Sequence, residues 1–519
     1  MKKAVESSDP AVQYTRALNY YLGREIKQDY KQAIKYFRLA ADQDHAGAQF
    51  RLGVCYYFGK GVKKNHKETI KYYKLSADQG DQDAQHMLGL LYFFGEGFKQ
   101  NYKQAVKWFK LAADQGNAAG QYRLGYCYYF GDGFKQDYKQ AVKWFKLAAD
   151  QGDEDAQYWL GLCYSFGDGV EIDHIKAVKY LKLAADQDHA IAQYRLGYCY
   201  YCAEGVKEDN KQAVKYFKLS ADQGNAMAQY RLGNCYYHGF GVKGDHKTAV
   251  KHFKLSADQG YEEAQFSLGN CYYFGDGVKE DNNQAVKYFK LSADQGNAKA
   301  LYRLGLDYHV KETKQTLIQA VNCYKLAAER GFVDAEYMLG CCYLGGIGVR
   351  PDEKKAIEYF NLAAQQENED AQYALSLIYF DPESTVGIDL KKAEEYRKKA
   401  IANGYKETEQ EKYNVALAEQ QSQVLKSKVI TKSQRNNVVQ LFPKQNPKEI
   451  ISTQIEKEAF DNGPSEINLA DQKAISPVNR NILVSPKENS IKYSTRELLT
   501  HAESKTLEFK ASARWDINQ

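Results

Sequence analysis

Ten cysteines are the side chains of this 519-residue chain that most readily suggest chemistry, because thiols form disulfides, bind metals and act as nucleophiles. Equivalent positions on stacked helices lie roughly 8–10 Å apart, whereas the Cα atoms of a disulfide lie within about 7 Å. The spacing also matches no zinc motif. We therefore expect unpaired, buried thiols that pack as small hydrophobic groups. Six of them share one position of a 36-residue period: Cys55, Cys127, Cys163, Cys199, Cys235 and Cys271.

Glycine-rich loops are the second feature that suggests chemistry. The sequence Gly131-Asp132-Gly133 recurs at 167–169 and 275–277. A phosphate-binding loop would continue with Lys-Ser/Thr, and a calcium loop would carry alternating acidic ligands, and neither follows here. These loops are expected to be turns that need positive φ. The ten histidines are scattered and form no Ser/His/Asp set, so the sequence predicts no catalytic residue, no metal and no cofactor.

All these residues recur because the chain is built from a 36-residue unit. Such a period indicates a helix pair that cannot bury its apolar face alone and stacks on copies of itself. We predict an all-α fold, a right-handed α-solenoid (superhelix) of about eleven 36-residue helix-turn-helix repeats with a largely disordered C-terminal tail. The period is clearest in one column of glutamines: Gln49, Gln85, Gln121, Gln157, Gln193, Gln229 and Gln265.

A column of nine glycines runs through the first helix of the units. A glycine inside a helix costs about 1 kcal/mol relative to alanine. Nine in register therefore predict that a second helix passes too close for any side chain. The column comprises Gly53, Gly89, Gly125, Gly161, Gly197, Gly233, Gly269, Gly305 and Gly340.

The recurring pattern A-Q-x-x-L-G-x-x-Y-x-x-G-x-G-V/F, followed by D-x-x-x-A-V-x-x-F-x-x-A-A, resembles the Sel-one-like repeat (SLR) family of tetratricopeptide-related solenoids. The resemblance covers roughly residues 11–404. It departs in the ninth unit, which loses its Gly-x-Gly loop to Val310-Lys-Glu-Thr, and in the eleventh, which has an irregular loop. The family implies a non-enzymatic scaffold or adaptor, of a kind common in bacteria and at host–microbe interfaces.

Similarity to tetratricopeptide repeats implies that a second stripe of the first helix lines a concave, partner-binding face. Tyrosine and arginine, which dominate this stripe, are enriched at binding hot spots. The predicted ligand is a protein or peptide segment, although repeat copying or packing against the neighbouring hairpin would produce the same columns. The candidate residues are Tyr122, Arg123, Tyr126, Tyr158, Tyr194, Arg195, Tyr198, Tyr230, Arg231, Asn234, Asn270 and Arg303.

The rest of the chain divides by composition into an N-terminal extension (1–10), a capping helix (405–428), a linker expected to be disordered (429–490) and a terminal segment (491–519). In the last of these, Glu503-Ser-Lys-Thr-Leu-Glu-Phe-Lys510 resembles the opening of a Schlafen/AlbA-type domain, through truncation or by chance. This leaves an alternative function open, as the targeting portion of a nucleic-acid-processing protein. An effector acting on host proteins is a third.

Net charge and hydropathy limit the classes of partner that the sequence supports. A net charge of +5 over 519 residues is too weak to indicate nucleic acid or a membrane surface, so nucleic acid is an improbable ligand for the repeats. No stretch approaches the ~18 apolar residues of a membrane span. The N-terminal sequence has two lysines but no apolar run behind them. We expect a cytoplasmic protein, with export by a signal-peptide-independent route left open.

Overall fold

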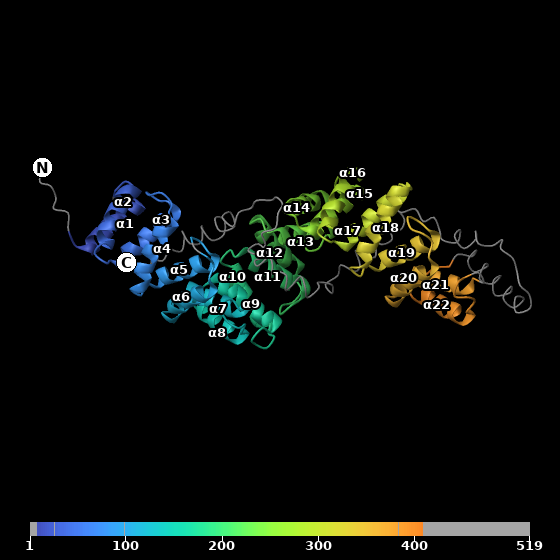
Figure 1. The fold of residues 1–519 in the computed structure, drawn as a ribbon, viewed down its shortest axis with the longest axis horizontal. Coiled ribbons are helices and arrows are strands. Elements are labelled where there is room, and N and C mark those ends of the chain that lie inside the picture. Colours follow the sequence, from blue (N-terminus) through green and yellow to red (C-terminus); the bar gives the residue numbers. More distant parts are fainter. Residues whose placement is uncertain (1–7, 25, 98, 382–383, 408–519) are drawn as a thin grey trace, which may run out of the picture. The chain divides into compact units, whose positions relative to one another are not determined.

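The computed structural model describes residues 8–407 except 25, 98 and 382–383, and this part contains twenty-two helices and no strand (Figure 1). The helices form eleven consecutive pairs, as predicted. The first begins at Pro10, and no helix is assigned at 405–407. Most of the expected capping helix, the linker and the segment 491–519 lie outside the described residues.

Each repeat consists of one odd-numbered and one even-numbered helix. The pairs are α1 (Pro10–Leu22) and α2 (Tyr30–Ala41), α3 (Ala46–Phe58) and α4 (His66–Asp78), α5 (Gln82–Phe94) and α6 (Tyr102–Asp114), α7 (Ala118–Phe130) and α8 (Tyr138–Asp150), α9 (Glu154–Phe166) and α10 (His174–Ala185), α11 (Ala190–Cys202) and α12 (Asn210–Asp222), α13 (Ala226–His238) and α14 (His246–Asp258), α15 (Glu262–Phe274) and α16 (Asn282–Asp294), α17 (Ala298–Val310) and α18 (Lys314–Ala328), α19 (Val333–Gly345) and α20 (Glu353–Gln365), and α21 (Glu369–Phe380) and α22 (Leu390–Ala402).

Local sequence fixes the ends of these helices. In repeat 4, Gly131 ends α7 in the left-handed region at φ 78°, and its N–H donates to the Cys127 carbonyl. Helix α8 begins at Asp137, whose carboxylate accepts from the Gln140 N–H at 3.0 Å. The N–H of Asp137 donates to the Tyr128 carbonyl at 2.9 Å. Because its backbone N–H is bonded to α7, Asp137 caps α8 through its carboxylate.

The glycine column marks the close approach of the two helices of one pair. A Cβ built on Gly125 would lie 2.7 Å from Cδ1 of Phe145 and 3.2 Å from the Ala141 carbonyl oxygen, both of α8. The same contact with an aromatic ring or leucine recurs at all nine glycines. The prediction of close helix contact is confirmed, and the neighbour that excludes a side chain is mainly a buried ring of the second helix.

The cysteine column packs as predicted. All ten cysteines are free, and the six of the column are buried. Burial raises the pKa of the Cys199 thiol to about 12, because the apolar surroundings disfavour a thiolate. These thiols remain protonated at neutral pH and contribute packing.

The glutamine column joins successive repeats, a role that the sequence did not reveal. Gln121 is buried in α7, and its Nε2 donates to the Ala113 carbonyl of α6 at 3.3 Å. Its Oε1 accepts from Nε2 of Gln151, at the end of α8, at 2.8 Å. One amide thus holds three helices. Both bonds recur at Gln49, Gln85, Gln157, Gln193, Gln229 and Gln265.

The Gly-x-Gly loops form the outer part of the same junctions. Gly133 has φ 81°, and a Cβ on it would lie 2.8 Å from the Tyr102 carbonyl, in the first turn of α6. The loop of repeat 4 therefore packs on the second helix of repeat 3. The positive φ of Gly133 confirms the predicted turn. The close approach to the Tyr102 carbonyl is a second reason why this position needs glycine.

Candidate functional site

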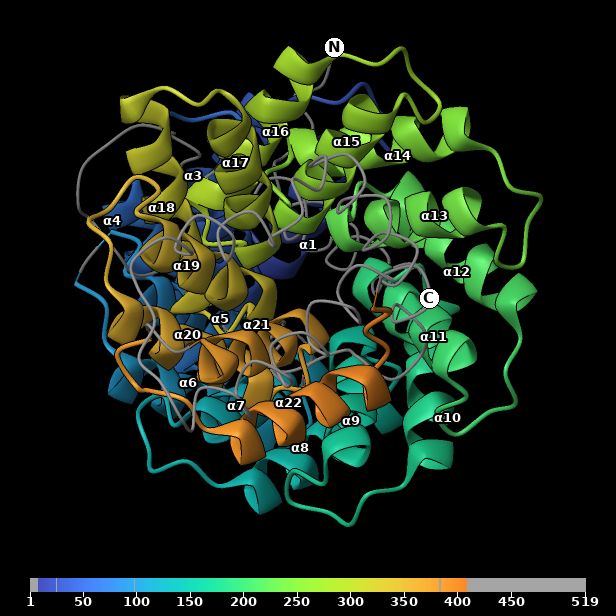
Figure 2. The same cartoon turned by 90° about the vertical axis from the view of Figure 1, so that its right-hand side faces the viewer.

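The twelve candidate residues all lie on first helices. Figure 2 shows α7, α9, α11 and α13 closer to the centre of the view than α8, α10 and α12, so first helices line the inner side of these repeats. Five candidates are partly exposed: Arg123, Tyr230, Arg231, Asn234 and Asn270. The other seven are buried: Tyr122, Tyr126, Tyr158, Tyr194, Arg195, Tyr198 and Arg303.

The tyrosines are buried because they pack within and between repeats. The Tyr194 ring lies 6.0 Å from the ring of Phe217, on the second helix of its own repeat. The Tyr158 ring stacks on His189, at the start of the next repeat, with centroids 5.0 Å apart and an interplanar angle of 23°. Aromatic pairs of this kind contribute about 0.5–1.5 kcal/mol beyond burial. These tyrosines therefore stabilise the stack of repeats, and little of their surface is left for a partner.

The arginines bridge neighbouring first helices. The Arg195 Cζ lies 5.5 Å from the ring centroid of Phe166 in α9 and 5.4 Å from that of Tyr198 in α11. The Arg231 Cζ likewise lies 5.9 Å from the Tyr198 ring of the preceding repeat. Cation–π contacts contribute about 0.5–2 kcal/mol each, depending on burial. The structure therefore brings Tyr194, Arg195, Tyr198, Tyr230 and Arg231 into one continuous cluster across α11 and α13.

Several polar atoms in this cluster and on the neighbouring first helix α15 have no hydrogen-bond partner within the described residues. They are Nε and Nη2 of Arg195 in α11, Nε of Arg231 in α13 and Oδ1 of Asn270 in α15. All these atoms are buried, and more than nine in ten buried polar groups in folded proteins form a hydrogen bond. Three consecutive first helices thus carry donors and an acceptor that the chain leaves unsatisfied.

The first-helix face also changes in composition at repeats 7 and 8. The column that holds Leu162 in repeat 5 and Tyr198 in repeat 6 holds Asn234 and Asn270 in the next two. The large side chains are buried, whereas both asparagines are partly exposed. A polar, more open segment therefore follows a closed aromatic one. This difference is present in the sequence, but a comparison of the repeats that looks for shared residues overlooks it.

Comparison with known proteins identifies the repeat. The Sel1 repeat model matches eleven consecutive segments, 10–45, 46–81, 82–117, 118–153, 154–189, 190–225, 226–261, 262–297, 298–332, 333–368 and 369–405. The chain belongs to the Sel1 repeat family. Its resemblance to this family, expected from the sequence, is confirmed.

One solved structure with an SLR fold agrees with this assignment. The chain is 32% identical to c5321, a protective antigen of uropathogenic Escherichia coli strains with an SLR fold, with a TM-score of 0.66 over 82% of this chain and 97% of that one. A Sel1 repeat protein from Oxalobacter formigenes is 31% identical, with a TM-score of 0.47 over 60% of this chain and 90% of that one. The curated proteins include no match.

Two features are absent from the described part of this Sel1-repeat protein. None of its helices has the length and apolar character needed to cross a membrane. No three histidine, cysteine, aspartate or glutamate side chains there are grouped as a metal site requires.

Proposed function

We propose that this Sel1-repeat protein is a scaffold that binds a protein or peptide segment on its first-helix face, centred on α11, α13 and α15. The observation that carries the proposal is the set of unsatisfied buried atoms on Arg195, Arg231 and Asn270. Leaving such a group unpaired costs about 1–3 kcal/mol, so a ligand that supplies the missing partners gains that energy on binding.

The unsatisfied atoms define the chemistry of the ligand. Guanidinium N–H groups donate to carboxylates in charge-assisted bonds, so acidic side chains suit Arg195 and Arg231. A backbone N–H suits Oδ1 of Asn270. The Arg231 and Asn270 side chains are partly exposed, and a ligand would reach their buried atoms by a side-chain rotation. The preferred segment is therefore acidic, extended or helical, and held over several repeats.

The proposal includes no catalytic role, because the face offers stacked rings, guanidinium groups and amides but no activated nucleophile. We place the protein in the cytoplasm, where ten free cysteines stay reduced. The net charge of the whole chain, +5, is too weak to favour nucleic acid as a ligand of the repeats.

The test is an array of 12-residue peptides, acidic and neutral, probed with the purified full chain. Acidic peptides should be retained, and Arg231→Gln should weaken their binding at least tenfold, which is about 1.4 kcal/mol. The control variant is Lys143→Ala/Lys179→Ala, which changes two exposed side chains on the second helices α8 and α10. If the lysine pair weakens binding and Arg231→Gln does not, the second helices form the working face and the proposal is wrong.

A further inference from the structure

Repeat 9 leaves one junction of the stack uncovered. Helix α17 ends at Val310 and α18 begins at Lys314, so only residues 311–313 connect them, whereas residues 275–281 connect the helices of repeat 8. In repeats 2–8 and 10, the second glycine of the loop lies against the first turn of the preceding second helix or its N-terminal part. In repeat 11, Ser384 and Thr385 bond instead to Glu353 of α20. Among the described residues, no loop covers the first turn of α16 in this way.

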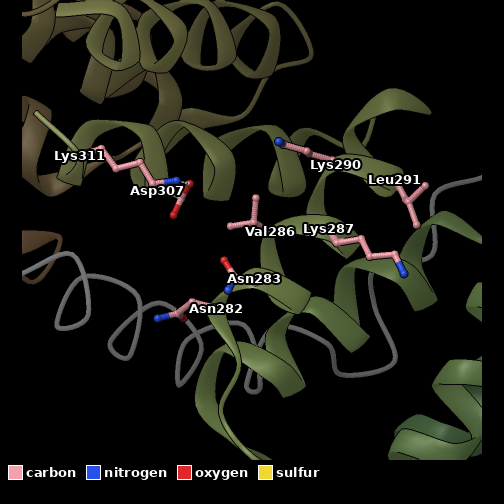
Figure 3. A pocket seen from close by; sticks show the side chains of 8 residues that line it. All are labelled: Asn282, Asn283, Val286, Lys287, Lys290, Leu291, Asp307 and Lys311. Atoms are coloured by element: carbon pink, nitrogen blue, oxygen red, sulfur yellow. Dashed lines mark hydrogen bonds and ion pairs between the residues drawn. The ribbon is translucent and has the colours of Figure 1, made fainter. Parts of the chain in front are cut away.

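A pocket of about 780 Å³ occupies the place of the missing loop (Figure 3). Figure 3 shows Val286 of α16 between Asn283 and Lys290, with Asp307 and Lys311 at the end of α17 beside it. Val286 is partly exposed, although the valines at the same position of five other repeats are buried. Those five are Val106, Val142, Val178, Val214 and Val250. We call this site the α16 pocket; it is lined by Asn282, Asn283, Val286, Lys287, Lys290, Leu291, Asp307 and Lys311.

The other repeats show what covers the equivalent surface of their second helices. In most of them the cover is Gly-x-Gly followed by Val or Phe, and the middle residue is often acidic, as in Gly275-Asp276-Gly277-Val278. There the Asp276 carboxylate accepts from the Tyr237 hydroxyl at 2.6 Å and lies 3.7 Å from Nδ1 of His246. The same positions one repeat later are Tyr273 and Asn282, which also carry donors. Of these two, Asn282 lines the α16 pocket, which therefore keeps a donor at the position of His246.

We propose that the α16 pocket binds a Gly-Asp-Gly-Val-type turn of another protein, which takes the place of the loop that repeat 9 lacks. The lysines at its rim, Lys287 and Lys290, favour the acidic middle residue. The pocket lies mainly on the second helix α16, with Asp307 and Lys311 at the end of α17. It contains none of the twelve candidate residues, so this site is separate from the proposed binding face and does not depend on the proposed function.

Neither the rest of this chain nor a second copy supplies such a turn. Residues 408–519 contain one glycine, Gly463, and so no Gly-x-Gly. In a second copy, the regular loops already cover their own neighbours. The loop of repeat 1 has Glu25 at the position of the second glycine, so its sequence is not Gly-x-Gly. A Cβ at that position meets helix backbone, as it would at Gly133, so this loop does not fit.

The experiment measures binding of a fluorescent probe to the full chain by fluorescence polarisation. The probe is a peptide with the sequence of residues 274–281, Phe-Gly-Asp-Gly-Val-Lys-Glu-Asp, flanked by two added cysteines whose disulfide closes the ring. Its matched control replaces the second glycine with alanine. The glycine peptide should bind at least tenfold more tightly than the alanine peptide, because the added Cβ meets the α16 backbone. Equal binding, or no binding of the glycine peptide at millimolar protein, overturns the proposal.

A variant of the protein locates the site. Val286→Lys fills the pocket from an already partly exposed position and should weaken the glycine peptide at least tenfold. Lys143→Ala, on the exposed face of α8, should leave its affinity within about twofold. Binding that withstands Val286→Lys places the peptide elsewhere and overturns the assignment. The comparison of the two peptides needs no change in the protein, so it decides the matter even if the variant does not fold.

Discussion

Replacing Gln193 with leucine tests whether the glutamine column holds the repeats together. Gln193 is 1% exposed in α11. Its Nε2 donates to the Ala185 carbonyl of α10 at 3.2 Å, and its Oε1 accepts from Nε2 of Gln223 at 2.8 Å. A net hydrogen bond contributes about 0.5–1.5 kcal/mol, so losing both costs roughly 1–3 kcal/mol. The Ala185 carbonyl still accepts from the Asp188 N–H at 3.1 Å, so it is not left unsatisfied and the expected cost stays within this range.

The assay is urea unfolding followed by circular dichroism, together with hydrogen exchange of the amides in α10–α12. Both are needed because a stack of repeats loses stability locally, between nearest neighbours. Gln223→Ala is the matched control. It breaks only the bond to Gln193 from an exposed position and should cost about 0.5 kcal/mol. If Gln193→Leu unfolds at the wild-type urea concentration, or Gln223→Ala costs as much, the column does not clamp the junction.

Three further predictions concern packing, pH and thiols. Gly197→Leu should destabilise by at least ~1–3 kcal/mol in the same unfolding assay, because a Cβ there lies 2.8 Å from the Phe217 ring; unchanged stability would contradict the close contact. Burial raises the pKa of Glu336, which replaces the column glutamine in repeat 10, so its folded state binds the proton more tightly and stability falls as pH rises through that raised pKa. Glu336→Gln should therefore shift the urea midpoint upward more at pH 7 than at pH 4.5, and an equal shift at both would show that the charge is not the cause. Iodoacetamide at pH 8 should spare Cys199 in the folded protein, and reducing agent should leave the melting temperature unchanged; rapid labelling of Cys199, or a lower melting temperature, would contradict a buried free thiol.

The sequence predicted the fold well because each repeat carries its own complete pattern. Gly125 and Phe145 belong to one helix pair, so their contact is encoded within a single unit. The same holds for the turn at Gly131 and the N-cap at Asp137. Averaging over eleven copies made each of these positions conspicuous.

Interactions between repeats were harder to predict. Gln121 was useful as a marker of the period, yet its partners lie eight residues before it and thirty after it, on two different helices. The burial of Tyr158 has the same origin, since His189 of the next repeat covers its ring. A first helix is flanked by second helices of two repeats, so a stripe that looks exposed on one isolated pair is closed in the stack. The sequence also showed that repeat 9 lacks its loop, but not that α16 is the helix left bare.

The regular junctions make whole repeats exchangeable. Because the amide of Gln121 finds its partners at fixed offsets, an in-frame duplication or deletion of one 36-residue unit among the regular repeats recreates the same bonds where the new neighbours meet. Gain or loss of a regular repeat can therefore lengthen or shorten the protein while the same junction bonds form. The short connection after Val310 is the exception, since it belongs to a single unit. Adding or removing a regular repeat on one side of this connection would change the number of repeats between it and that end of the stack.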